Sequence, residues 1–366
     1  MKKKFAFMVH PRDLGDVVQY SPAAAGKRPE LVRKVLEWMP PHHLSHITGV
    51  RSASTGEEIE GDFVSMPLLP EQILSLDRRS VVERVVKAAQ LAQELGAQIV
   101  GLGGYTAVVG GSGKIVSQKV DIPVTSGNCY TVAIALEAVT RLADVLDLDL
   151  RRSSVCVVGA TGSIGAVCAL ELARRVGSVV LLARSRSRLQ QLADRIHRET
   201  PCAVGLEQDV ERGLREADII VSATSSGGGL IQTQFLKPGT VVCDIGVPHD
   251  VSEEAAHLRP DILVIEGGMV EAPGDPEFNF DFGYPKSVCM ACMAETMALT
   301  LENRFENFSI GRGLEYEHVV EIAALAGRHG FRLAGFRSFG RPVTRDRLDE
   351  FREESRRARR GLRVVR

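Results

Sequence analysis

Three glycines spaced three residues apart carry the clearest chemical signal in this sequence. Residues 155–158 are apolar and run directly into Gly159, Gly162 and Gly165. In a strand–turn–helix unit, the first glycine permits a tight turn. The second lets the backbone approach a pyrophosphate, and the third lets the helix pack closely on the strand. The phosphates then face the positive end of that helix. The pattern therefore predicts a dinucleotide site formed by the residues Gly159, Ala160, Thr161, Gly162, Ser163, Ile164 and Gly165.

The flanking residues strengthen this prediction. The spacing G-x-x-G-x-x-G differs from the G-x-G-x-x-G of many dinucleotide-binding turns, and a glycine triplet alone also fits an ordinary strand-to-helix turn. Here an apolar run precedes the turn, and the segment 166–176 that follows is amphipathic and free of proline. This combination favours the dinucleotide site.

The end of the next apolar strand bears on which dinucleotide binds. Sites for NADH usually carry an acidic residue about twenty positions after the glycines, where it bonds the ribose hydroxyls. The strand 179–183 is instead followed by Arg184, Ser185 and Arg186. Two arginines could bind a 2′-phosphate, so the sequence favours NADPH. The alternative is that both arginines are only solvated at the start of the next helix.

A second candidate for chemistry is the cysteine pair Cys289 and Cys292, which lies in an apolar segment. A zinc site would need a second cysteine pair or a close histidine pair, so no metal is expected. A thioredoxin-like dithiol has no suitable context inside an apolar helix. The residues alone leave two alternatives: two buried core cysteines, or one thiol that acts as a nucleophile.

An alternation of strands and helices from 153 to 271 must position the glycine turn. The expected strands are 155–158, 179–183, 203–207, 218–223, 241–245 and 262–266. This order predicts a Rossmann-like, mostly parallel sheet over about residues 151–285, with right-handed crossovers. Because ligands lie beyond the carboxyl ends of such strands, Ala223, Thr224 and the loop 225–229 should border the cofactor.

The remainder of the chain predicts a second, mixed α/β domain over residues 1–150. It contains a first strand, a strand pair within 47–66 and an amphipathic helix over 80–95. A helix over 287–305 should pack back on this domain, so that about 286–335 completes it. The fold class is therefore α/β, with two domains and C-terminal helices.

Two further segments leave alternatives open. Phe278, Phe280, Phe282 and Tyr284 alternate along the chain, and could line an apolar channel or seal a domain junction. The basic tail 336–366 fits either a solvated terminal helix or a docking patch for an acidic partner.

Composition narrows the class of protein. The 366 residues are 44% hydrophobic and 25% charged, with a formal net charge of −1, which is ordinary for a globular protein and gives no attraction to nucleic acid. No apolar run approaches the about twenty residues of a membrane-spanning helix. The first residues lack the apolar length and cleavage site of a secretory signal. Seven cysteines, mostly in apolar segments, fit reduced thiols in a cytoplasm.

Several segments together resemble one enzyme family across roughly residues 30–335. Besides the glycine turn, these segments are Leu-Gly-Gly-Tyr-Thr (102–106), Thr-Ser-Gly-Asn-Cys-Tyr-Thr (125–131), Met-Ala-Cys-Met-Ala-Glu (290–295), Asn-Phe-Ser-Ile-Gly-Arg (307–312) and Arg-His-Gly-Phe (328–331). In this order they resemble the long-chain acyl-acyl-carrier-protein reductases of cyanobacteria. The resemblance implies that a cysteine takes up the acyl chain as a thioester, which NADPH reduces to a fatty aldehyde.

The same resemblance places the nucleophile at Cys292 and leaves Cys289 outside the matched segment. It implies acyl carrier protein or acyl-CoA as the acyl donor, and an aldehyde-consuming enzyme as a further candidate partner. The domain over 1–150 would then hold the acyl chain. Two other functions stay open: a reductase of the shikimate or glutamyl-tRNA reductase type, and an NADP-binding regulator without turnover.

This chemistry needs a thiolate and donors for an oxyanion. Cys292 is expected more than one turn inside its helix, so the helix dipole should help little and a nearby cation is needed. The candidates are Lys286, His249 and His329.

Glu295, one turn after Cys292, should be paired if it is buried; the alternative is a solvated helix face. The candidates for oxyanion donors or pocket walls, which could equally be turn caps, are Tyr105, Thr125, Ser126 and Asn128. Asn307, Ser309 and Arg312 could likewise shape the pocket or cap a loop.

Overall fold

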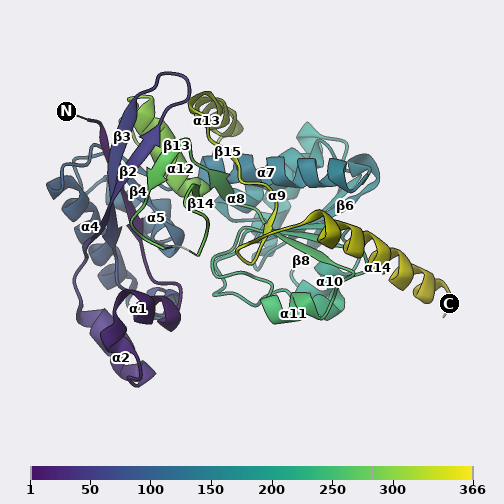
Figure 1. Cartoon of the computed structure of the whole chain (residues 1–366). Coiled ribbons are helices and arrows are strands. Elements are labelled where there is room, and N and C mark those ends of the chain that lie inside the picture. The colour runs from purple at the N-terminus through teal and green to yellow at the C-terminus, as the bar shows by residue number, and fades with distance from the viewer. Residues whose placement is uncertain (1, 282, 365–366) are drawn as a thin grey trace. The chain divides into compact units, whose positions relative to one another are not determined.

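The computed structural model describes residues 2–281 and 283–364 and divides into two compact units (Figure 1). Unit 1 comprises Met1–Tyr130 and Val270–Arg332. Unit 2 comprises Thr131–Met269 and Leu333–Arg366. Phe282 of the aromatic alternation lies outside the described residues.

Unit 1 is built on a mixed six-stranded sheet of order β13-β2-β3-β1-β4-β5. β1 pairs in parallel with β3 and β4, and β4 pairs in parallel with β5, whereas β2 runs antiparallel to β3 and to β13. The strand bounds are β1 Lys4–Val9, β2 His42–Arg51, β3 Glu58–Ser65, β4 Val100–Leu102, β5 Val124–Thr125 and β13 Gly274–Glu277.

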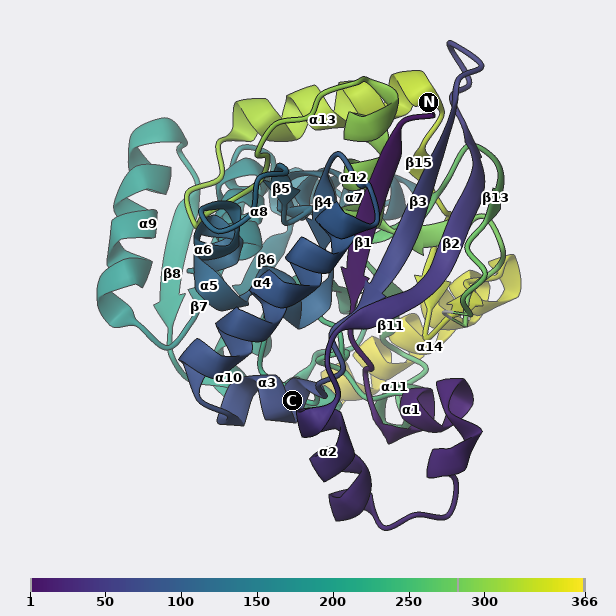
Figure 2. The same cartoon turned by 90° about the vertical axis from the view of Figure 1, so that its left-hand side faces the viewer.

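Alternation along β1 and β3 gives this sheet two apolar faces. Ala6 and Val64 face α4 (Arg78–Glu94), whose valines and alanines form the core on that side (Figure 2). Phe7 and Phe63 point to the opposite face, because successive side chains of a strand alternate. α12 (Ala291–Leu301) contacts β1, β3 and β4, and nearly every one of its residues is buried.

The other elements of unit 1 are short. The helices are α1 Leu14–Tyr20, α2 Pro29–Trp38, α3 Pro70–Ser75, α5 Val109–Ser112, α6 Lys114–Ser117 and α13 Tyr316–His329. A separate sheet of order β14-β12-β15 consists of β12 Met269–Glu271, β14 Val288–Met290 and β15 Arg332–Leu333.

Unit 2 carries a fully parallel six-stranded sheet of order β11-β10-β9-β6-β7-β8. Counted from its first strand, this is the order 3-2-1-4-5-6 of the doubly wound dinucleotide-binding fold. The strands are β6 Ser154–Val158, β7 Ser178–Leu182, β8 Ala203–Glu207, β9 Ile219–Ser222, β10 Val241–Asp244 and β11 Leu263–Glu266. The prediction of a Rossmann-like parallel sheet is confirmed.

Helices and a small hairpin accompany this sheet. The helices are α7 Asn128–Val145, which begins at the end of the first segment of unit 1, α8 Ser163–Ala173, α9 Arg186–Glu199, α10 Val210–Leu214, α11 Glu253–His257 and α14 Arg345–Val364. The hairpin pairs β16 Arg337–Ser338 with β17 Arg341–Pro342. None of the helices within the described chain has the length and apolarity that crossing a bilayer would require.

Two expectations about the C-terminal part are wrong. The helix expected over 287–305 is split: residues 288–290 form β14, and α12 begins only at Ala291. Sheet pairing keeps Met290 extended and so delays the helix. The tail is also not wholly solvated, because Leu348 and Phe351 of α14 are buried.

Candidate functional site

The glycine turn has the geometry that a dinucleotide site requires. Gly159 has a φ of +79°, and a Cβ there would lie 2.5 Å from the carbonyl oxygen of Ala223. A Cβ at Gly165 would collide with the carbonyl of Gly159. Gly162 is the N-cap of α8 and has no side chain, so a phosphate can approach the backbone at the positive end of this helix. Glycine is therefore required by close packing at the two outer positions.

The loop after β7 carries the two arginines for which the sequence predicts contact with a 2′-phosphate. The backbone N–H groups of Gly159 and Ala160 both donate to the carbonyl of Leu182, which ties the turn to the end of β7. Arg184 and Arg186 follow that end and are exposed. Arg186 donates to the carbonyl of Leu206 at 3.0 Å, so it is partly held by the protein.

The end of β9 lies beside the glycine turn, and the contact of Ala223 and Thr224 with a cofactor stays a prediction. Ala223 contributes the carbonyl that approaches Gly159, and its N–H donates to Val158 of β6. The Thr224 hydroxyl lies 2.7 and 2.8 Å from the two carboxylate oxygens of Asp250, a fully buried residue. Thr224 therefore fixes the loop through its side chain.

Cys292 differs from the other cysteines. All seven lie within the described chain and are free thiols, and six are buried, whereas Cys292 keeps partial exposure. It is the second residue of α12, so the expectation that it lies deep inside its helix is wrong. Burial raises the pKa of Cys292 to about 12, while backbone N–H groups of Met293, Cys292 and Gly104 act in the opposite direction.

A turn from unit 1 packs directly on Cys292. Gly127 has a φ of +72°, and a Cβ there would collide with the Cα and Cβ of Cys292. The turn 125–130 therefore needs glycine at this position in order to approach the start of α12 so closely.

Glu295 stabilises the same turn through hydrogen bonds. Its side chain is fully buried, and it accepts hydrogen bonds from the Thr125 hydroxyl and, at 2.8 Å, from the N–H of Tyr130. Burial raises the pKa of Glu295, and these donors oppose that shift. The expectation of a paired, buried carboxyl is confirmed, and a solvated helix face is excluded.

The hydroxyl groups near Cys292 mostly form hydrogen bonds within the protein. Ser126 donates to the carbonyl of Ser309, whose own hydroxyl accepts from the N–H of Cys129 at 3.1 Å. Asn307 accepts from the N–H of Val124 at 2.8 Å.

These contacts favour the loop-capping alternative for Thr125, Ser126, Asn307 and Ser309. Asn128 is buried at the start of α7, Tyr105 is buried, and Arg312 is exposed.

The three cations expected beside the thiol are engaged elsewhere. Lys286 pairs with Glu277 and, at 2.9 Å, with Asp275. His329 is buried 2.8 Å from both the Ser52 hydroxyl and a carboxylate oxygen of Glu302. His249 belongs to unit 2, where its Nε2 lies 3.3 Å from Glu266 and its Nδ1 lies 3.8 Å from Asp244. The expectation of a thiol-stabilising cation among these residues therefore finds no support.

Sequence reasoning missed His10, at the end of β1. Its Nε2 accepts the N–H of Tyr105 at 2.9 Å, and its Nδ1 lies 2.9 Å from the carbonyl oxygen of Pro11. Its ring meets the Tyr105 ring edge-on at 5.8 Å. A lone histidine before a proline carries no motif, so only the folded contacts reveal it.

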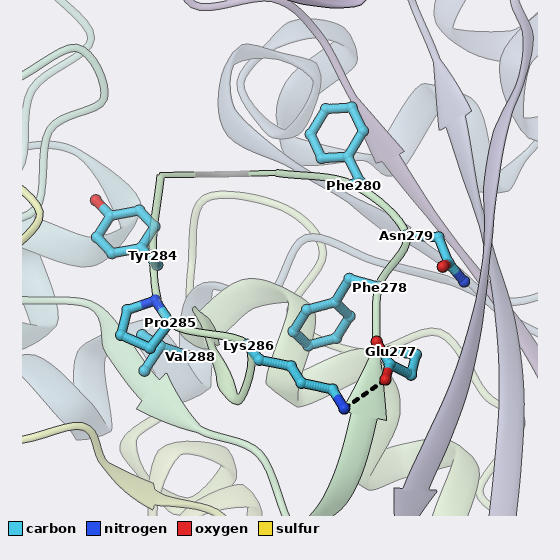
Figure 3. A pocket seen from close by; sticks show the side chains of 8 residues that line it. All are labelled: Glu277, Phe278, Asn279, Phe280, Tyr284, Pro285, Lys286 and Val288. Atoms are coloured by element: carbon cyan, nitrogen blue, oxygen red, sulfur yellow. Dashed lines mark ion pairs between the residues drawn. The ribbon is translucent and has the colours of Figure 1, made fainter.

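The aromatic segment packs on unit 1 and borders a small pocket (Figure 3). Phe278 and Phe280 both contact Phe63 of β3, and Phe280 also stacks on Tyr20 of α1 at 4.3 Å. The pocket is lined by Glu277, Phe278, Asn279, Phe280, Tyr284, Pro285, Lys286 and Val288. Its lining is mixed: aromatic and aliphatic side chains stand beside Asn279 and the Lys286–Glu277 ion pair.

Comparisons with known proteins give the chain a family. The long-chain acyl-[acyl-carrier-protein] reductase of Synechococcus elongatus is 33% identical over 307 residues, which cover 80% of this chain and 87% of that protein. This chain belongs to the long-chain acyl-[acyl-carrier-protein] reductase family. A family model described as Shikimate / quinate 5-dehydrogenase matches residues 140–266. The matched range contains all six strands of the Rossmann-like sheet.

A second curated protein and a solved structure differ in how much of each chain the similarity covers. Aminotransferase PigE of a Serratia species is 34% identical over 361 residues, but this chain spans only 41% of its length. The solved structure of L-tryptophan dehydrogenase from Nostoc punctiforme is 11% identical and covers 98% of this chain and 89% of its own, with a TM-score of 0.41.

Proposed function

We propose that this protein reduces a fatty acyl thioester to a fatty aldehyde with NADPH, through an acyl group bound to Cys292. The single observation that carries the proposal is that this thiol is accessible at the start of α12. Among seven cysteines it alone is accessible, and it sits in the first turn of α12, within one of the segments by which the sequence resembles the family.

The first half of the reaction is acyl transfer. Cys292 loses its proton, and its thiolate attacks the carbonyl carbon of the incoming thioester. A carbon–sulfur bond to Cys292 forms, the bond to the carrier sulfur breaks, and the carrier thiolate takes up the proton that Cys292 released. Exchange of one thioester for another is nearly isoenergetic. The backbone N–H groups of Met293, Cys292 and Gly104 lower the pKa of this thiol, and they are the candidate donors to the transient oxyanion. Glu295 and Gly127 keep the adjacent turn in place.

The second half is reduction. The glycine turn and the start of α8 would hold the pyrophosphate, and Arg184 and Arg186 would hold the 2′-phosphate. When bound, NADPH supplies the hydride that reduces the thioester carbonyl. The bond from the carbonyl carbon to Cys292 then breaks, which releases the aldehyde and returns the thiolate.

The acyl donor in this proposal is acyl-[acyl carrier protein], with acyl-CoA as the alternative donor. The apolar side of the small pocket, formed by Phe278, Phe280 and Val288, is a candidate part of the acyl site. An apolar aldehyde product calls for an enzyme that consumes it. Reduced thiols throughout the chain fit a cytoplasmic setting.

Intact-mass measurement tests the covalent step. The protein is mixed with palmitoyl-[acyl carrier protein] without NADPH, and a mass gain of one acyl group is expected. Cys292→Ala should show no gain, whereas Cys289→Ala, which removes a buried thiol three residues earlier, should label like the parent protein.

Adding NADPH to the labelled protein should then release aldehyde and restore the original mass. Aldehyde output from Cys292→Ala equal to that of the parent would overturn the proposal. Binding of NADPH with no acyl labelling of any variant would instead favour a regulator without turnover.

A further inference from the structure

His10 is fixed by two hydrogen bonds that define its protonation. Its Nε2 accepts from a backbone N–H, that of Tyr105, so this nitrogen carries no proton. The proton is then on Nδ1, which donates to the carbonyl of Pro11 at 2.9 Å. Burial lowers the pKa of His10, in keeping with a neutral ring, although Asp16 acts in the opposite direction. Asp16 is itself paired with Arg12 at 2.8 Å.

The strand pair β1–β4 brings this ring to the segment after β4. Met8 pairs with Leu102 in the parallel register, so His10 and the Gly103–Tyr105 segment leave the sheet side by side. The N–H of Gly103 donates to the carbonyl of Met8 at 3.0 Å. Gly104 has a φ of +55°, and a Cβ there would lie 2.6 Å from His10 Nε2. The imidazole therefore fills the space against the Gly104 backbone.

The same segment reaches the start of α12. A Cβ at Gly101 of β4 would collide with the hydroxyl of Thr296, which itself lies one turn after Cys292 and donates to the Cys292 carbonyl at 3.3 Å. α12 packs on β4, which brings the segment after β4 to the start of the helix, and the backbone N–H of Gly104 is among the groups that lower the pKa of Cys292. This donor comes from outside α12 and depends on how the segment 103–105 is held.

We propose that His10 is a positioning residue for the reactive thiol: by accepting the Tyr105 N–H and packing on Gly104, it orients the Gly104 N–H toward Cys292. The inference rests on Cys292 being the reactive thiol of the proposed function. A neutral imidazole thus takes part in the site without contacting the reacting atoms. It acts through the backbone in place of the cation that the sequence led us to expect.

A matched pair of substitutions tests this role. In His10→Gln, the side-chain amide can reach the position of Nε2 and accept the Tyr105 N–H. In His10→Asn, the shorter amide reaches only the position of Nδ1, so it can bond Pro11 but not Tyr105. Both variants stay polar and smaller than histidine, which limits folding defects. His329→Gln is the control, because His329 is a buried histidine of unit 1 that contacts Ser52 and Glu302 instead.

The readout is the rate at which iodoacetamide alkylates Cys292, followed by mass spectrometry of its peptide across alkaline pH. Loss of one donor to a thiolate should raise the thiol pKa by about one unit, which slows alkylation about tenfold at a fixed pH below that pKa. We expect this loss in His10→Asn, at least partial recovery in His10→Gln, and no change in His329→Gln. Single-turnover acyl transfer should fall in the same order, with the NADPH dissociation constant unchanged.

Alkylation of His10→Asn at the parent rate would overturn the inference, and so would an equal loss in His10→Asn and His10→Gln when both unfold at the parent temperature. Acyl labelling of Cys292 in the parent protein is a separate measurement. The proposed function can therefore stand while the role of His10 fails, and alkylation can report on His10 even if acyl labelling fails.

Discussion

At the scale of single residues, Glu295 has two effects on the site: it stabilises the turn over Cys292, but it makes the thiolate of Cys292 less favourable. Its carboxylate accepts from Thr125 and Tyr130, which stabilises the turn over Cys292, but its charge raises the pKa of that thiol. In Glu295→Gln the charge disappears, and an amide NH₂ faces donors that need an acceptor. We therefore expect the free energy of unfolding to fall by about 1–3 kcal/mol. We also expect alkylation of Cys292 at alkaline pH to become faster.

Urea denaturation and the alkylation assay measure these two effects. Glu302→Gln is the control, because Glu302 is also a carboxylate of unit 1 but pairs with Arg328 and His329. Slower alkylation of Glu295→Gln than of the parent would show that turn geometry, and not charge, controls the thiol. Equal stability of Glu295→Gln and the parent would show that the carboxylate is dispensable for the turn.

At the scale of elements, the Rossmann-like unit was predictable because its signals are local. Each strand is an apolar run between turns, and the glycine turn occupies consecutive positions between β6 and α8. The start of α12 was not predictable from its apolar sequence. Residues 288–290 join a sheet with strands distant in sequence, and that pairing decides where the helix begins.

The hydrogen-bond and ion-pair partners of the candidate side chains were also hard to predict, because most of them come from distant segments of the chain. Glu295 could be expected to be paired because a buried carboxyl needs donors wherever they come from. The engagement of Lys286 by Asp275, and of His329 by Ser52, depends on folded contacts between separate segments. His10 was missed for the same reason, since its role lies in the backbone of Tyr105, 95 positions away.

The loop between β7 and α9 yields a prediction about cofactor choice. Arg184 is exposed, whereas Arg186 already donates to Leu206. Arg184→Ala should therefore weaken NADPH binding about tenfold or more, as expected for loss of a charge-assisted bond to phosphate, and leave NADH binding nearly unchanged. Arg186→Ala should have a smaller effect.

Isothermal titration with both cofactors measures the difference. Arg188→Ala is the matched control, since Arg188 is an exposed arginine on the same helix. Equal losses for NADPH and NADH in Arg184→Ala would mean that this arginine does not read the 2′-phosphate.

At the scale of the whole molecule, each unit is assembled from two separate stretches of chain. The second stretch of unit 2 is the C-terminal end of the chain, which includes α14. The first half of this helix is docked on the unit. Leu348 and Phe351 are buried, and Arg347 donates to the carbonyls of Pro260 and Ile262. Farther along, Arg356, Arg357, Arg359 and Arg360 are exposed, although Arg359 still donates to the carbonyl of Pro238. A docking role for this basic end toward an acidic partner stays a prediction.

The docked half of α14 should contribute to the stability of unit 2. Phe351 is 4% exposed, and truncating a buried phenylalanine costs about 3–5 kcal/mol, because contacts are lost and a cavity remains. Phe351→Ala should therefore lower the unfolding transition that NADPH stabilises. Arg357→Ala, an exposed change two helical turns later, should shift stability by no more than about 0.5 kcal/mol. Thermal unfolding with and without NADPH separates this transition from that of unit 1, since only a folded state that binds the ligand is stabilised by it. If Phe351→Ala leaves the NADPH-dependent transition unmoved, then α14 is an appendage, and unit 2 is complete without the last stretch of the chain.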